Sequence, residues 1–136
     1  MAFSNSSVCL VHGMSRPVGA VFHLPHGLSN AVLLPAVTRF SIAAAPRRYA
    51  EVARTVGAAG THDADETAAA RLADWLDELN RDLGVPRLGE CKGVSREVLD
   101  AQVEKMAADA LASGSPANNP RVPTEQQIVE LYREAW

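Results

Sequence analysis

Three of the four histidines lie in residues 11–27, VHGMSRPVGAVFHLPHG, a stretch that contains no carboxylate. If this segment is helical, His12 and Arg16 are one turn apart and share a face. His26 follows a proline-containing turn, so two neighbouring helices can aim His12 and His26 at one point. Neutral imidazole nitrogens at such a point suit zinc or iron. The spacing makes His12 and His26 candidate metal ligands.

Two imidazoles do not complete a metal site, because a catalytic metal usually takes three protein ligands and keeps one position open. The separation of His12 and His26 also matches no standard zinc signature. The competing interpretation is a pair of packed histidines that each donate one hydrogen bond. The residues alone leave both interpretations open.

Other residues that could bind a metal have simpler explanations. His23 directly precedes the turn at Pro25 and is interpreted as a cap of that turn. His62 lies among threonine, aspartate and alanine, and a place on the surface is expected for it. Cys9 is expected to be a small buried hydrophobic residue rather than a ligand.

Composition limits the class of protein. The 136 residues are 47% hydrophobic and 21% charged, which predicts one globular domain and excludes extensive disorder. A net charge of −3 gives no basic surface for nucleic acid. Cys9 and Cys91 form no CxxC pair and indicate free thiols in a reducing compartment, most simply the cytoplasm. No signal peptide is visible, and polar residues and prolines interrupt the apolar residues 17–44, so no membrane helix is expected.

Charge is distributed unevenly along the chain. No Asp, Glu or Lys occurs before Glu51, and all 16 acidic residues lie in the remainder. The outer face of a domain is normally wetted by charged and polar groups. Either the rest of the chain buries the first segment on all sides, or the segment packs on a partner surface.

Apolar periodicity and capping residues predict an all-α fold, a bundle of about six helices. Helices are expected over residues 4–22, 27–40, 46–56, 63–83, 95–113 and 124–135. Pro17 is expected to kink the first helix or end it near Arg16. Capping residues are expected at Asp63–Glu66, at Ser95 and at the Thr124–Gln127 box.

Several segments resemble the iron-containing (group III) alcohol dehydrogenases. The resemblance is carried first by VHGMSRPVGAVFHLPHGLSNAVLLP, at residues 11–35, which is similar to the metal-binding segment of that family. It continues through RYAEVAR at 48–54, LNRDLGVP at 79–86 and NPRVPTEQQIVELYREAW at 119–136. It covers essentially the whole chain and identifies residues 1–136 as a partial C-terminal helical domain of that family.

The resemblance implies hydride transfer between NAD or NADP and a small alcohol or aldehyde, with Fe²⁺ or Zn²⁺ polarising the substrate oxygen. In the family the metal is held by an Asp and a His from an upstream helix and by two later histidines, whose positions His12 and His26 match. Arg16 stands where the family usually has another histidine, and its contact with a substrate carboxylate, a cofactor phosphate or a structural partner is open. Ala36 likewise replaces a common histidine.

The upstream ligands and the dinucleotide-binding domain have no counterpart in these residues. We therefore expect the C-terminal part of a dehydrogenase that by itself is inactive and binds neither metal nor cofactor tightly. The partner implied is the missing N-terminal half or another subunit; a homo-oligomer is left open. The alternatives are a non-enzymatic helical subunit that packs on another chain, or one half of a split dehydrogenase.

Overall fold

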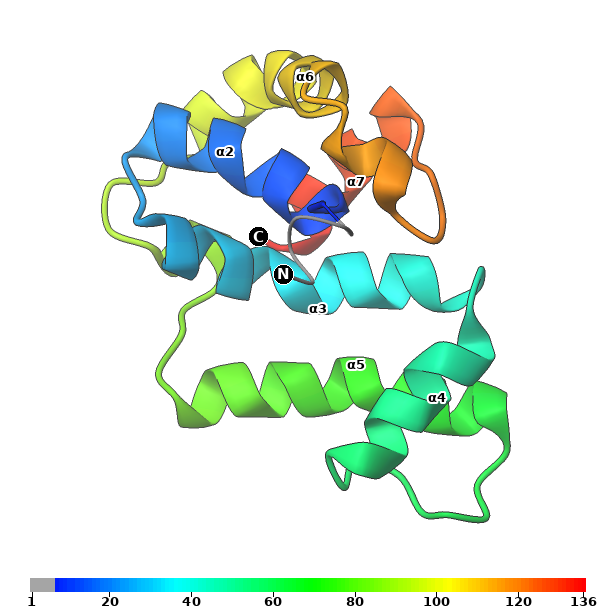
Figure 1. The fold of residues 1–136 in the computed structure, drawn as a ribbon. Helices are drawn as coiled ribbons and strands as arrows, with labels where there is room; N and C mark the ends of the chain where they lie inside the picture. Colours follow the sequence, from blue (N-terminus) through cyan, green and yellow to red (C-terminus); the bar gives the residue numbers. More distant parts are fainter. Residues whose placement is uncertain (1–6) are drawn as a thin grey trace.

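Residues 7–136 are described by a computed structural model, and in that range they form six α-helices and two 3-10 helices, with no strand. The α-helices are α2 (Leu10–Phe22), α3 (His26–Ile42), α4 (Pro46–Thr55), α5 (Asp65–Asp82), α6 (Arg96–Ala112) and α7 (Glu125–Glu134). The 3-10 helices are η1 (Leu88–Glu90) and η2 (Ser115–Asn118). The prediction of an all-α chain is confirmed (Figure 1).

The helices pack around one main core and one small core. In the main body α2 packs on α3 and α6, and α6 packs on α7. Helices α4 and α5 form a hairpin, and α5 lies along α3 (Figure 1). The main core includes the fully buried side chains of Met14, Leu33 and Tyr132, whereas alanines and Leu72 fill the small core between α4 and α5. Helices α2 and α3 thus form the centre of the structure.

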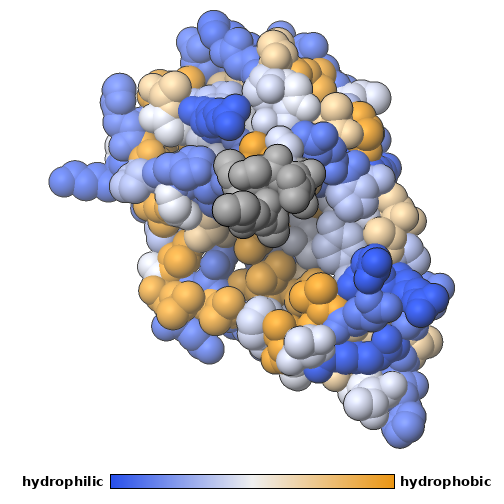
Figure 2. All heavy atoms as spheres, in the orientation of Figure 1, coloured by the Kyte–Doolittle hydropathy of each residue, from blue (hydrophilic) through white to orange (hydrophobic). Residues whose placement is uncertain are grey.

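The charge-poor α2 and α3 are largely buried but keep exposed positions. Leu10, Met14 and Leu33 are fully buried, but Arg16 is exposed and Leu34 is 38% exposed. Hydrophobic residues also gather over α3 and α5 on the face seen in Figure 2. The expectation that the rest of the chain could bury this segment on all sides is therefore wrong for the described residues. None of the described helices is long and apolar enough to cross a membrane.

The expected caps of α6 and α7 are present. The Ser95 hydroxyl accepts a hydrogen bond from the Val98 amide at the start of α6. Thr124 and Gln127 bond to each other's backbone amides at the start of α7. These local hydrogen bonds satisfy amides that the first turn of a helix leaves unpaired. Helix starts of this kind are therefore correctly predicted from short sequence motifs.

Two local predictions need correction. Of the two outcomes expected at Pro17, a kink or an end near Arg16, the end does not occur, because α2 continues to Phe22 with Pro17 buried inside it. Packing on α3 and α6 outweighs the one backbone hydrogen bond that a proline removes. No capping box forms at residues 63–66, since α5 begins after Ala64 without a side-chain cap. The Asp63 carboxylate instead accepts from the Gly60 amide and pairs with Arg71.

Candidate metal centre

Helix α2 sets the position of His12. Its buried face carries Leu10, Met14 and Val18, and this orientation leaves the His12 side chain half-buried. At the neighbouring Gly13, α2 approaches η2 so closely that an added Cβ would lie 3.0 Å from two ring atoms of Pro116. The missing side chain at Gly13 therefore allows α2 to lie at this depth.

The turn between α2 and α3 sets the position of His26. His23 caps the end of α2 in the left-handed conformation, with φ 55° and ψ 32°, and its side chain is exposed. Histidine adopts this region more readily than most residues other than glycine. Pro25 then precedes α3, which begins at His26. The prediction that His23 belongs to the turn is confirmed.

The two candidate ligands face each other across this turn. The ring centroids of His12 and His26 are 5.2 Å apart, and the ring planes are inclined by 57°. Burial lowers the pKa of His12, and the nearby charges of His26 and Arg16 lower it further. A low pKa favours the neutral imidazole, which is the form that binds a metal ion. The structure thus brings the two histidines together, and the lowered pKa of His12 favours its neutral form.

Asn30 is a member of this cluster that the sequence interpretation missed. It lies one turn after His26 on α3, and its Nδ2 is 3.1 Å from the His26 Nε2. The Asn30 Oδ1 is buried without a hydrogen-bond partner in the described residues. An amide that engages one ring nitrogen fixes the orientation of the imidazole. The spacing of four residues from His26 is the signal that would have identified it.

Arg16 adds a positive charge beside the histidines. It is exposed, and its charge contributes to the lowered pKa of His12. Among residues 7–136 its guanidinium makes no ion pair. The first turn of α3 carries no acidic residue and no side-chain cap. Neither of the two helices that carry the histidine pair contains an acidic residue.

The histidine pair does not form a complete site within the described part of the chain. No three His, Cys, Asp or Glu side chains there come close enough to hold one metal ion. His62 is exposed in a loop, as expected. Cys9 is half-buried rather than buried, and its Sγ is 3.4 Å from the Asn118 carbonyl oxygen that accepts its hydrogen bond. A metal ion held by this pair would need further ligands from outside the described residues.

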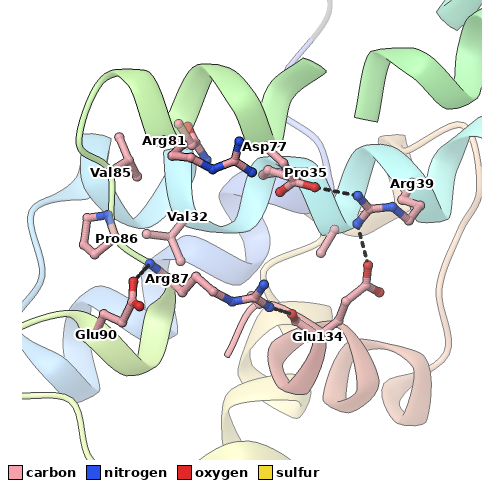
Figure 3. Close-up of a pocket in the computed structure, with 13 residues that line it drawn as sticks. Val32, Pro35, Arg39, Asp77, Arg81, Val85, Pro86, Arg87, Glu90 and Glu134 are labelled. Carbon is pink, nitrogen blue, oxygen red and sulfur yellow. Dashed lines mark hydrogen bonds and ion pairs between the residues drawn. The ribbon is translucent and has the colours of Figure 1, made fainter. Parts of the chain in front are cut away.

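A separate cavity of about 570 Å³ lies between α3, α5, η1 and α7 (Figure 3). It contains none of the sequence-predicted ligands. It is lined by Val32, Pro35, Ala36, Arg39, Asp77, Asn80, Arg81, Val85, Pro86, Arg87, Glu90, Glu134 and Ala135. Ala36, the other departure from the family pattern, therefore lies in this cavity and not beside the histidines.

Arg39 joins three helices at the edge of this cavity. Its guanidinium on α3 lies 2.7 Å from Asp77 of α5 and 2.8 Å from Glu134 of α7 (Figure 3). Burial acts to lower the pKa of Arg39, but hydrogen bonds to both carboxylates outweigh burial and raise it. The Arg87 guanidinium also donates to the Glu134 carbonyl oxygen, at 2.7 Å. The polar residues that line this cavity therefore form an ion-pair network that joins α3, α5 and α7.

Comparison of the sequence with known proteins identifies the family to which the chain belongs. The sequence model described as "Fe-containing alcohol dehydrogenase family, C-terminal" matches residues 1–136. The chain is 38% identical over its whole length to lactaldehyde reductase of Escherichia coli K12, and 36% identical to 1,3-propanediol dehydrogenase of Klebsiella pneumoniae. It covers only 35% and 34% of those two proteins, about a third of their length.

Solved structures show the same relationship. A crystal structure of 1,3-propanediol oxidoreductase superimposes with a TM-score of 0.90 at 34% identity, over 100% of this chain and 35% of that one. An iron-containing alcohol dehydrogenase from Thermococcus thioreducens superimposes with a TM-score of 0.80 at 38% identity, over 98% of this chain and 33% of that one. The chain belongs to the Fe-containing alcohol dehydrogenase family and corresponds to its C-terminal helical region.

Proposed function

We propose that residues 1–136 are the C-terminal, metal-holding portion of an NAD(P)-dependent alcohol dehydrogenase that acts on a small alcohol or aldehyde. The observation that carries the proposal is the convergence of His12 and His26, with ring centroids 5.2 Å apart, in a chain of this family. Relatives named for lactaldehyde and 1,3-propanediol support a small oxygenated substrate. The cavity beside Arg39 has no part in this proposal.

The residues present fit part of a metal site. His12 and His26 would hold Fe²⁺ or Zn²⁺ through neutral imidazole nitrogens. Asn30 lies one turn after His26, and its buried Oδ1 has no hydrogen-bond partner in the described residues. Buried polar atoms normally have a partner, so this one is consistent with a site whose other residues lie outside the described part of the chain. The metal, when bound, supplies Lewis-acid polarisation of the substrate oxygen. The remaining ligands, an Asp and a His by resemblance, belong to an upstream helix.

The chain's own groups prepare the site in distinct ways. Asn30 would orient a metal-bound His26 ring by accepting its free N–H at Oδ1, after the amide turns from the contact in which Nδ2 lies 3.1 Å from Nε2. Partial burial lowers the pKa of His12 and so favours the neutral imidazole, the form that acts as a ligand. The close approach at Gly13 sets the depth of the helix that carries His12. Arg16 places a permanent positive charge next to the position of the substrate.

By themselves, residues 1–136 are then expected to bind metal weakly and to show no turnover with NAD(P). The partner is a dinucleotide-binding half, in the same polypeptide or in a separate one, which contributes the upstream ligands. A reducing compartment such as the cytoplasm suits the two free cysteines.

The test compares the 136-residue chain with the assembled enzyme, in which it is joined to or co-produced with the dinucleotide-binding half. Bound metal is measured by elemental analysis after dialysis, and turnover is measured with 1,3-propanediol and with lactaldehyde. The assembled enzyme should retain about one metal ion per chain. His12→Ala and His26→Ala should each abolish retention and turnover, whereas His62→Ala, which changes an exposed loop histidine, should change neither.

Two results would contradict the proposal. One is stoichiometric metal that survives dialysis on the 136-residue chain alone. The other is an assembly with no metal that His12→Ala leaves unchanged, which would identify a non-enzymatic helical subunit. A separate polypeptide that restores metal and turnover would instead identify a split enzyme with the same site.

A further inference from the structure

The cavity between α3, α5, η1 and α7 contains positive charges that its ion-pair network does not use. Three arginines and three acidic residues line it, and Arg39 pairs with two of the acids, Asp77 and Glu134. The third acid, Glu90, accepts the backbone N–H of Arg87 at 2.9 Å. Each carboxylate of the lining therefore already faces a donor. Two of the three guanidiniums, in contrast, form no ion pair within residues 7–136.

Arg81 and Arg87 carry these two guanidiniums. Arg81 lies in the last turn of α5, and Arg87 directly precedes η1, so the two side chains belong to different walls of the cavity (Figure 3). The Arg87 guanidinium donates to the Glu134 carbonyl oxygen, which leaves other N–H donors of its fork free. Arg16 and Arg133 also form no ion pair in the described chain, but neither lines this cavity. Two such groups around one cavity distinguish this place from the rest of the surface.

The floor of the cavity is apolar and lies below its charged rim. Val32, Ala36 and Ala135 line it and are buried, whereas the two arginines are exposed. Its volume of about 570 Å³ falls within the range of small-molecule sites, about 300–1,000 Å³. The ten residues of α3 from His26 to Ala36 correspond to about 15 Å along the helix, so the cavity is separate from the histidine pair.

We propose that this cavity binds a small phosphate monoester, with the phosphate between Arg81 and Arg87 and the carbon chain on the apolar floor. A phosphate monoester carries a charge of about −1.5 to −2 at pH 7 and three terminal acceptor oxygens. These oxygens diverge, so they can meet guanidiniums from two walls, whereas a single guanidinium fork satisfies both oxygens of a carboxylate. The site serves binding alone, because no bond of the ligand is made or broken there.

The test is a calorimetric titration of the metal-free 136-residue chain, which contains every residue of the cavity. The probes are butyl phosphate, inorganic phosphate and pentanoate. Butyl phosphate should bind most tightly, because inorganic phosphate has no carbon chain to cover the floor and pentanoate has one acceptor oxygen fewer. Arg81→Gln should weaken its binding by about 10-fold or more, the effect of losing a charge-assisted hydrogen bond. Arg87→Gln should have a similar effect.

Arg133→Gln is the matched control. Arg133 is an exposed arginine on α7 that forms no ion pair within the described chain and does not line the cavity. The same change of charge at this position should leave the affinity for butyl phosphate unchanged. The control thus separates a site between two arginines from a general attraction of the anion to a charged surface.

A second titration determines whether the cavity stays open in the assembled enzyme. It is carried out without metal, so that phosphate has no metal to bind, and with NAD(P) at saturation, so that the cofactor's phosphate contacts are occupied. Arg81→Gln should again weaken the binding of butyl phosphate by about 10-fold or more.

Four results would overturn the proposal. The first is that butyl phosphate does not bind, and the second is that Arg81→Gln weakens its binding no more than Arg133→Gln does. The third is pentanoate that binds as tightly as butyl phosphate, because the phosphate is then not what the site recognises. The fourth is binding to the 136-residue chain that disappears in the assembled enzyme, which would show that the N-terminal half covers the cavity. None of these measurements depends on turnover, so a failure of the proposed function would be recognised separately.

Discussion

Replacing Asn30 with alanine should weaken metal binding without weakening the fold. The Asn30 amide lies beside His26, with Nδ2 3.1 Å from Nε2, and its Oδ1 can accept the ring N–H that a metal-bound His26 donates once the amide turns over. Loss of a group that orients a metal ligand typically lowers metal affinity by about 10- to 100-fold. At 25 °C this range corresponds to about 1.4–2.7 kcal/mol of binding free energy.

The same substitution removes an unfavourable feature of the metal-free fold. A buried polar atom without a partner, such as the Asn30 Oδ1, costs about 1–3 kcal/mol, whereas the lost hydrogen bond contributes only about 0.5–1.5 kcal/mol. Alanine also has a higher helix propensity than asparagine, by about 0.6 kcal/mol. The free energy of unfolding of Asn30→Ala should therefore rise by about 1 kcal/mol in the absence of metal.

Two measurements on one variant test this reasoning. Urea denaturation of the metal-free chain gives the free energy of unfolding, and calorimetric titration of the assembled enzyme gives the affinity for Fe²⁺ or Zn²⁺. Asn80→Ala is the matched control on α5, because its amide donates to the Ala31 carbonyl oxygen at 2.8 Å and both of its polar atoms are satisfied or exposed. The control should lose stability and keep its metal affinity. A destabilised Asn30→Ala with unchanged metal affinity would refute the assigned role.

Three other measurements probe the surrounding structure. Burial, followed by the charge of Asp109, raises the pKa of Tyr132 above that of the unfolded chain. The contribution of Tyr132 to the free energy of unfolding is therefore complete below about pH 10 and declines above it, by up to about 1.4 kcal/mol per pH unit. Urea denaturation at a series of pH values should show this slope in the wild type but not in Tyr132→Phe. Gly13→Ala should lower the free energy of unfolding by about 1–3 kcal/mol, because the new Cβ meets the ring of Pro116 in η2. Gly27→Ala, which has open space around it, should raise the free energy of unfolding by about 0.5–1 kcal/mol. Equal effects of the two substitutions in urea denaturation would contradict the close packing at α2. Burial also raises the pKa of the Cys91 thiol, so iodoacetamide should alkylate it more slowly in the native chain than in urea, as peptide mapping would show.

Local signals in the sequence predicted the helical elements well. Ser95 and the Thr124–Gln127 box mark helix starts because each cap is formed by residues within one turn. The corrections at Pro17 and at residues 63–66 have different causes. Packing on α3 and α6 holds a helix that continues through Pro17, which no local pattern predicts. At residues 63–66 a local competition decides, because Gly60 and Arg71 engage the Asp63 carboxylate in place of a cap.

The candidate site was only partly predictable. His12 and His26 followed from helical spacing and the turn between them, and the structure brings their rings together. Asn30 was missed because an asparagine inside a helix resembles an ordinary surface residue until its neighbour is identified as a candidate ligand. The ion pair between Arg39 and Glu134 joins α3 to α7, and no local sequence pattern predicts a contact between residues so far apart in the chain.

One hydrogen bond has a consequence for the order of events during synthesis. The Tyr132 hydroxyl on α7 donates to the Met14 carbonyl oxygen on α2, at 2.8 Å, across a sequence separation of 118 residues. This contact with the helix that carries His12 therefore forms only once α7 has been synthesised. Contacts this distant in sequence form late. The contact between α7 and α2 is therefore one of the last parts of the frame around the proposed metal centre to assemble.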